Sequence, residues 1–169
     1  KNWRYPGFRI SWTVGPKKVI EAVASAGSFL DGGGSRPAQQ AAIALLGDDV
    51  IDAETTAIRK TFAQKRDFLV DKLTSLGVRV DLPPQGGFYV WGSVENLPRG
   101  LDDGMGFFQA MLDKQVITVP GSVFDINPVR RRSGSRSRFE RYVRFSFGPP
   151  MATLMTVTDR IADVIMAGI

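Results

Sequence analysis

Two cationic side chains at the start of the chain, Lys1 and Arg9, are spaced so that together they could bind an anion. Pro6 and Gly7 argue against a helix between them, because proline restricts the residue before it and glycine adopts unusual backbone angles. From residue 8 to residue 14 apolar and polar side chains alternate, which predicts a strand with Arg9 on its polar face. An amine and a guanidinium would then come from a loop and the strand that follows it. This pair suits a small anionic ligand with a reactive carbonyl group.

A third cation, Arg144, lies in a second alternating stretch, residues 142–147, which also predicts a strand. A guanidinium on a half-buried strand requires a partner, because an unpaired charge in a low dielectric is costly. The residues alone leave two interpretations open. One is a structural salt bridge to Asp125 or Glu140. The other is recognition of a ligand carboxylate, which the planar guanidinium can bind through two parallel hydrogen bonds.

The composition excludes several kinds of chemistry. The 169 residues include no histidine and no cysteine, so this stretch can build no imidazole base, thiolate or disulfide, and we expect no metal site. Acid–base work would fall to Lys, Asp, Glu or Tyr. The hydrophobic content of 43% is that of a globular chain, and no apolar run of about 18 residues predicts a membrane span. The absence of cysteine is typical of a cytoplasmic protein, which is the location we predict.

The net charge of +5 is concentrated in one stretch. Between Arg130 and Arg144 there are seven arginines and one acidic residue, Glu140. Arginine-rich segments can bind RNA, which is one interpretation of this stretch. However, only Phe139 interrupts the run up to Arg141 with an aromatic ring, and charge runs of this kind are typical of solvated loops. We therefore predict a loop and do not expect nucleic acid as the partner.

The rest of the sequence predicts helices alternating with short strands. Apolar stripes with helical spacing and their end signals predict helices at 17–26, 38–46, 52–76, 105–112 and after Pro149–Pro150. Asp102 or Asp103 would cap the helix near residue 105. Alternating or short apolar runs predict strands at 78–82, 88–91, 116–119 and 142–147.

The interval from Lys1 to Gly7 and Arg9, followed by an apolar strand, resembles the lysine motif of the fold-type-I pyridoxal-phosphate enzymes, the class I/II aminotransferases. One position departs from that motif, since Ser11 stands where the family usually has glycine. The resemblance implies an α/β fold class. Residues 1–50 would be the C-terminal end of the large cofactor-binding domain, and residues 51–169 a small α+β C-terminal domain. It also implies that the chain is the C-terminal portion of a longer polypeptide.

Three further segments carry the resemblance in the expected order. Pro84–Tyr89 resembles the family's Pro-x-Gly-x-Phe segment, and Val119–Phe124 resembles its Pro-Gly-x-x-Phe turn. The strand around Arg144 resembles the segment that holds the family's substrate-carboxylate arginine. Only residues 128–141 have no counterpart in the family's pattern, and we predict that they are an insertion between two strands.

The resemblance implies a role for five residues. Lys1 would be the catalytic Schiff-base lysine that binds pyridoxal 5'-phosphate, and Arg9 would bind the cofactor phosphate. Ser35 would contact the cofactor phosphate across a homodimer interface. Arg144 would hold the substrate carboxylate, and Gly87 would line the substrate pocket. The implied function is transfer of an amino group between an amino acid and a 2-oxo acid in amino-acid biosynthesis.

The resemblance also leaves two alternatives to an aminotransferase open. The same residues could serve another fold-type-I reaction, such as that of a decarboxylase or a lyase. The chain could also be an aminotransferase-like ligand-sensing domain of a transcription regulator. Such domains usually have a lysine-to-arginine interval one residue shorter than that from Lys1 to Arg9, so the interval favours the enzyme.

Overall fold

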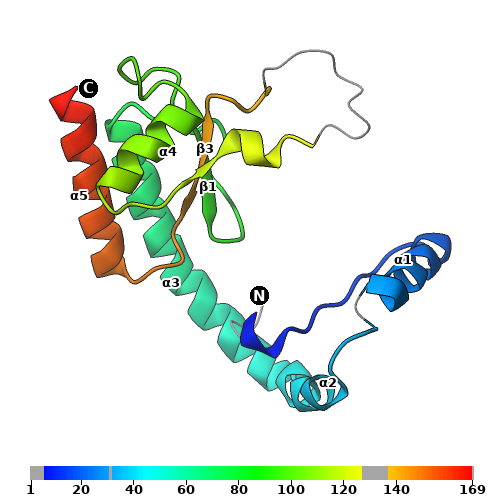
Figure 1. Ribbon diagram of the computed structural model, residues 1–169. Helices are drawn as coiled ribbons and strands as arrows, with labels where there is room; N and C mark the ends of the chain where they lie inside the picture. The colour runs from blue at the N-terminus through cyan, green and yellow to red at the C-terminus, as the bar shows by residue number, and fades with distance from the viewer. Residues whose placement is uncertain (1–5, 31, 127–136, 169) are drawn as a thin grey trace. The chain divides into compact units, whose positions relative to one another are not determined.

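The chain forms two compact units, Lys1–Arg59 and Lys60–Ile169 (Figure 1). The computed structural model describes residues 6–30, 32–126 and 137–168. The predicted domain boundary at residues 50 and 51 stays a prediction. None of the helices in the described ranges is long and apolar enough to cross a membrane.

The first unit is helical in its described part. It contains the short 3-10 helices η1 (Pro6–Phe8) and η2 (Ala44–Leu46), the helices α1 (Lys17–Leu30) and α2 (Arg36–Ile43), and the beginning of α3 (Asp48–Ser75). The helices predicted at 17–26, 38–46 and 52–76 are therefore confirmed, with boundaries shifted by a few residues. Ser35 caps α2, because its Oγ accepts a hydrogen bond from the Ala38 backbone N–H at 3.4 Å.

The strand predicted from residue 8 to residue 14 is wrong. Phe8 ends η1, and residues 9–16 have no regular secondary structure. Arg9 takes a left-handed backbone conformation, with φ of 55°. A strand needs a neighbouring strand to pair its N–H and C=O groups, and the described part of this unit contains none. The alternating apolar side chains Trp12 and Val14 are exposed instead of buried.

The second unit is built on a three-stranded antiparallel sheet with the strand order β1-β3-β2. Its strands are β1 (Tyr89–Ser93), β2 (Val119–Pro120) and β3 (Tyr142–Ser146). The predicted strands at 88–91 and 142–147 are thus confirmed, whereas the one at 116–119 is reduced to its end. β3 is the central strand, so its side chains lie between neighbours on both sides.

Helices cover one face of this sheet. The end of α3 packs there with α4 (Gly104–Asp113) and α5 (Met151–Ala167) (Figure 1). Val90, Val143 and Phe145 of the sheet are buried, and they share one core with Phe107 of α4 and Ile161 of α5. Burial of these apolar side chains is the main stabilising term of the unit. Both predicted helices are confirmed, including the Asp103 cap, whose carboxylate accepts from two backbone N–H groups of the first turn of α4.

The strand predicted at 78–82 exists only as a single bridge. The Arg79 N–H donates to the Ser93 carbonyl at 2.9 Å, and the Ser93 N–H donates back at 2.8 Å. Val78 is buried, but Leu82 is 84% exposed and two prolines follow it. Since proline has no N–H to donate, the pairing ends close to the bridge.

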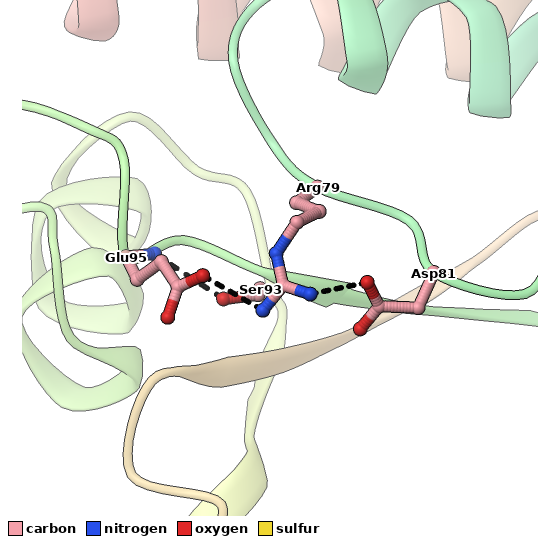
Figure 2. Close-up of polar contacts among 4 residues, drawn as sticks. All are labelled: Arg79, Asp81, Ser93 and Glu95. Atoms are coloured by element: carbon pink, nitrogen blue, oxygen red, sulfur yellow. Dashed lines mark hydrogen bonds and ion pairs between the residues drawn. The ribbon is translucent and has the colours of Figure 1, made fainter.

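Carboxylates flank the side chain of the bridge residue Arg79. Figure 2 shows its guanidinium between Asp81 and Glu95, with 2.7 Å from Nη2 to the Glu95 carboxylate. Desolvation lowers the pKa of Arg79, but the two carboxylates outweigh it, so that the pKa is raised above its ordinary value. The group is a permanently charged part of the surface. Exposed pairs of this kind contribute little to stability.

A close backbone approach at Gly121 yields a first prediction. A Cβ atom at Gly121 would lie 2.8 Å from the Tyr142 carbonyl oxygen and would also collide with the Phe139 carbonyl. Gly121→Ala should therefore lower the free energy of unfolding by about 1–3 kcal/mol, measured by urea denaturation. The matched control is Gly86→Ala, because a Cβ atom there meets nothing within 4 Å. Equal stability of both variants would contradict this packing.

Candidate active site

Arg144 projects from the sheet face opposite the helical core. Its neighbours in β3, Val143 and Phe145, are buried, whereas Arg144 is half-buried. The side-chain alternation of a strand therefore fixes the face on which the guanidinium lies. In the sheet register Arg144 lies between Trp91 of β1 and Val119 of β2. A cation is thus held at the middle of a small sheet.

Two aromatic rings contact this cation. The Arg144 Cζ atom lies 4.1 Å from the ring centroid of Tyr89 and 4.6 Å from that of Phe124. Both distances are within the range of cation–π attraction. In the described part of the chain the two rings make no contact with each other, so each covers its own part of the guanidinium. The N–H edge of the guanidinium remains the group suited to bind an anion.

The structural salt bridge, one of the two interpretations of Arg144, is not found among the described residues. Among the residues that the structure describes, Arg144 forms no ion pair. The Asp125 carboxylate instead accepts hydrogen bonds from the Ser137 hydroxyl at 2.7 Å and from the Arg138 backbone N–H at 3.2 Å. A half-buried guanidinium whose described neighbours are aromatic rings suits a carboxylate that arrives with a ligand.

An aromatic cluster extends the same sheet face. The rings of Trp91 and Tyr142 are stacked, with centroids 5.5 Å apart and an interplanar angle of 13°. Phe124 and Phe139 each meet the Trp91 ring edge-on, at 5.6 Å and 5.5 Å. Such pairs add to stability beyond their buried area. These four rings pack against one another on the sheet face that carries Arg144.

Gly87 lies in the loop that leads into β1. Its φ of 70° is in the left-handed region that favours glycine, and the predicted substrate-lining position therefore has a backbone reason to lack a side chain. The next residue is tied to the sheet, because the Phe88 carbonyl accepts from the Phe147 N–H at 2.9 Å. Tyr89, two positions after Gly87, is the residue whose ring contacts Arg144. Gly87 thus lies at the end of the sheet where β1 begins, two residues before the ring that contacts Arg144.

Two cations of α3 hold the segments that flank this end of the sheet. The Lys65 ammonium donates to the Gly148 carbonyl at 3.3 Å, just after β3. The Arg66 guanidinium donates to the Pro84 carbonyl at 3.4 Å, just before the Gly87 loop. Both contacts fix backbone that leads into the site.

The other predicted site residues belong to the first unit. Lys1 lies outside the described residues. Arg9 is exposed, and its Nη1 donates to the Pro6 carbonyl at 3.2 Å. That bond uses one of the five guanidinium donors, so the residue retains donors that fit a phosphate. The Ser35 hydroxyl accepts from Ala38 N–H, which leaves its own O–H as a donor. The predicted binding of the cofactor phosphate by Arg9 and Ser35 stays a prediction.

Sequence reasoning missed the two aromatic partners of Arg144. Tyr89 ends the segment Pro84–Tyr89, and Phe124 ends the turn Val119–Phe124, so both lie in motifs that were recognised. The available signal was an aromatic residue at the end of each motif. In the described ranges no group of three or more His, Cys, Asp or Glu residues could hold a metal ion.

The chain is similar to known proteins in sequence and in fold. The family model "Aminotransferase class I and II" matches residues 1–161. An LL-diaminopimelate aminotransferase of Moorella thermoacetica is 36% identical over 124 residues, which are 72% of this chain and 30% of that protein. An uncharacterized HTH-type transcriptional regulator of Bacillus subtilis, YisV, is 33% identical over 71% of this chain and 24% of that protein.

Solved structures of aminotransferases are also similar to this chain. A mutant of Thermus thermophilus aspartate aminotransferase matches with a TM-score of 0.76 and 27% identity, over 96% of this chain and 40% of that one. N-succinyldiaminopimelate aminotransferase from Mycobacterium tuberculosis matches with a TM-score of 0.76 and 28% identity, over 96% and 39%. The chain belongs to the class I and II aminotransferase family, and the predicted fold class is confirmed. It spans between about a quarter and two fifths of the length of the relatives named here.

The lack of an ion pair at Arg144 in the described structure yields a second prediction. Removing one member of a buried salt bridge usually costs about 3–5 kcal/mol, whereas loss of a cation–π contact costs about 0.5–2 kcal/mol. Arg144→Met should therefore lower the unfolding free energy by no more than about 2 kcal/mol in urea denaturation. Arg99→Met, at an exposed loop position, is the matched control. A loss above about 3 kcal/mol would instead indicate a structural ion pair.

Proposed function

We propose that the chain is part of a pyridoxal-phosphate-dependent aminotransferase that moves an amino group between an amino acid and a 2-oxo acid. The observation that supports this most is the half-buried guanidinium of Arg144, which meets aromatic rings and no carboxylate among the described residues. A substrate carboxylate would complete it. The family membership of the chain supports the same function.

The start of the chain would bind the cofactor. In this proposal Lys1 is the residue that holds pyridoxal phosphate covalently, and the Arg9 guanidinium neutralises the phosphate. The Ser35 hydroxyl would donate to the phosphate of a neighbouring subunit, which requires a homodimer. When bound, the cofactor supplies the electron sink that stabilises negative charge at the substrate Cα.

The chain's own acid–base group would be Lys1. In this proposal its amine takes the proton from the substrate Cα and returns one later. Arg144 would hold the α-carboxylate through two N–H···O bonds and so fix the direction of the Cα–H bond. The bare Gly87 position would leave room for the substrate beside the loop. Cytoplasmic location stays a prediction.

The substrates are proposed only as classes. By their names, relatives act on LL-diaminopimelate, N-succinyldiaminopimelate or aspartate, and all of these are amino acids. An α-amino acid donor and a 2-oxo acid acceptor are the classes that Arg144 would recognise. Decarboxylation or elimination on the same scaffold is the competing reaction, and the products distinguish it. Transamination releases a 2-oxo acid with the carbon skeleton of the donor intact.

A second candidate is the ligand-sensing domain of a transcription regulator. The similarity to YisV, an HTH-type transcriptional regulator by its name, favours it. In that case the purified protein would bind the cofactor and an amino acid but would turn over no 2-oxo acid. The same assay therefore separates the two candidates.

A third prediction concerns Lys1. Borohydride reduction of the purified holoenzyme, followed by peptide mapping, should leave the cofactor attached to Lys1. The Lys1→Ala variant should lose transamination by at least about a thousandfold, because both covalent attachment and proton transfer depend on that amine. Mutation of Lys17, which is exposed, to Ala is the matched control and should retain full activity.

Two results would contradict this assignment. One is label on a lysine other than Lys1 after reduction. The other is a Lys1→Ala variant that still converts an amino acid to its 2-oxo acid at the rate of the unaltered enzyme. Cofactor attachment at Lys1 without turnover of any amino acid would support the regulator candidate instead.

A further inference from the structure

Asp125, the residue after Phe124, is hydrogen-bonded to residues that lie 12 and 13 positions later in the chain. Phe124 is the last residue of η3 (Gly121–Phe124). The next side chain, Asp125, accepts the hydrogen bonds from Ser137 and Arg138 at 2.7 Å and 3.2 Å. Residues on both sides of the undescribed range 127–136 are therefore fastened by a single carboxylate. That carboxylate adjoins the ring that contacts Arg144.

Other contacts fix Phe124 as well. Its ring meets Trp91 edge-on at 5.6 Å, and Trp91 is stacked on Tyr142. At the start of η3, Gly121 lies so close to the Tyr142 backbone that a Cβ atom would be 2.8 Å from its carbonyl oxygen. The Phe124 ring thus packs against Trp91 of the sheet. The next residue, Asp125, is hydrogen-bonded through its carboxylate to Ser137 and Arg138.

We propose that Phe124 is a positioning residue for Arg144, and that Asp125 sets its place through hydrogen bonds to Ser137 and Arg138. The inference rests on the proposed function in one respect, namely that the ligand of Arg144 is the substrate carboxylate. Phe124 touches the guanidinium and is not proposed to touch the reacting atoms.

The physical reason is preorganisation. An arginine side chain has many rotamers, and ordering it when the ligand binds costs free energy. The Tyr89 and Phe124 rings, at 4.1 Å and 4.6 Å from Cζ, hold the guanidinium in advance with its N–H edge open. The carboxylate contact is the same in the ground state and the transition state. Loss of the ring should therefore raise KM and leave kcat nearly unchanged.

The test uses succinate, a carboxylate without an amino group, titrated into the holoenzyme by calorimetry. Phe124→Leu keeps an apolar side chain but removes the ring, and Asp125→Ala removes the acceptor. Each should raise the Kd of succinate by about 3- to 30-fold, the range expected for loss of one cation–π contact. Phe124→Tyr keeps the ring and should bind succinate like the unaltered enzyme. Ser137→Ala, which removes one of the two Asp125 bonds, should give a smaller rise.

Two matched controls lie away from Arg144. Phe108→Leu changes a half-buried ring of α4, and Asp102→Ala removes a half-buried carboxylate that accepts from the Gly100 backbone N–H at 3.0 Å. Neither should change the Kd of succinate. In steady-state transamination, Phe124→Leu and Asp125→Ala should raise KM by the same factor as Kd, with kcat within about twofold.

The outcomes separate this inference from the proposed function. Succinate affinity that is unchanged in both Phe124→Leu and Asp125→Ala overturns the inference. Succinate binding that is retained by the Arg144→Met variant overturns it as well. Succinate binding that depends on Phe124 in a protein without transamination upholds the inference and refutes the proposed function. An equal loss in the two controls would show general destabilisation and would also overturn it.

Discussion

The central interaction of this structure is a guanidinium held against aromatic rings on the sheet face opposite the helical core. Arg144 is half-buried, and in the described residues it contacts Tyr89 and Phe124 and forms no ion pair. Such a charge is tolerated because aromatic faces attract cations and because its N–H edge can still be hydrogen-bonded. An anionic ligand would complete its bonding, which is why the site is better explained by binding than by stability.

The rest of the second unit serves to place this group. Alternation along β3 directs Val143 and Phe145 into the helical core and Arg144 to the opposite face. The antiparallel neighbours then supply the surroundings: β1 brings Tyr89 and Trp91, and β2 leads into η3 with Phe124. One buried core thus fixes the position of Arg144, a side chain that is not part of it.

Sequence reasoning found β1, β3, α4 and α5 of the second unit and the position of Arg144, because periodicity and turn residues are local signals. The strands predicted at 78–82 and 116–119 are only a bridge and a two-residue strand, respectively. It failed for residues 8–14, where the same period of two gave no strand since the described part of the first unit offers no strand to pair with. It also failed to find the contacts of Tyr89 and Phe124 with Arg144. These residues lie 55 and 20 positions before Arg144 in the chain, and only the strand register brings them together.

The most direct measurement is a crystal structure of the holoenzyme with a bound amino-acid substrate analogue. The ligand carboxylate should accept two hydrogen bonds from the Arg144 guanidinium, at about 2.7–2.9 Å, while the rings of Tyr89 and Phe124 stay against it. A ligand carboxylate bound elsewhere, with Arg144 paired to a carboxylate of the protein itself, would contradict the assignment of Arg144 as the substrate-binding residue.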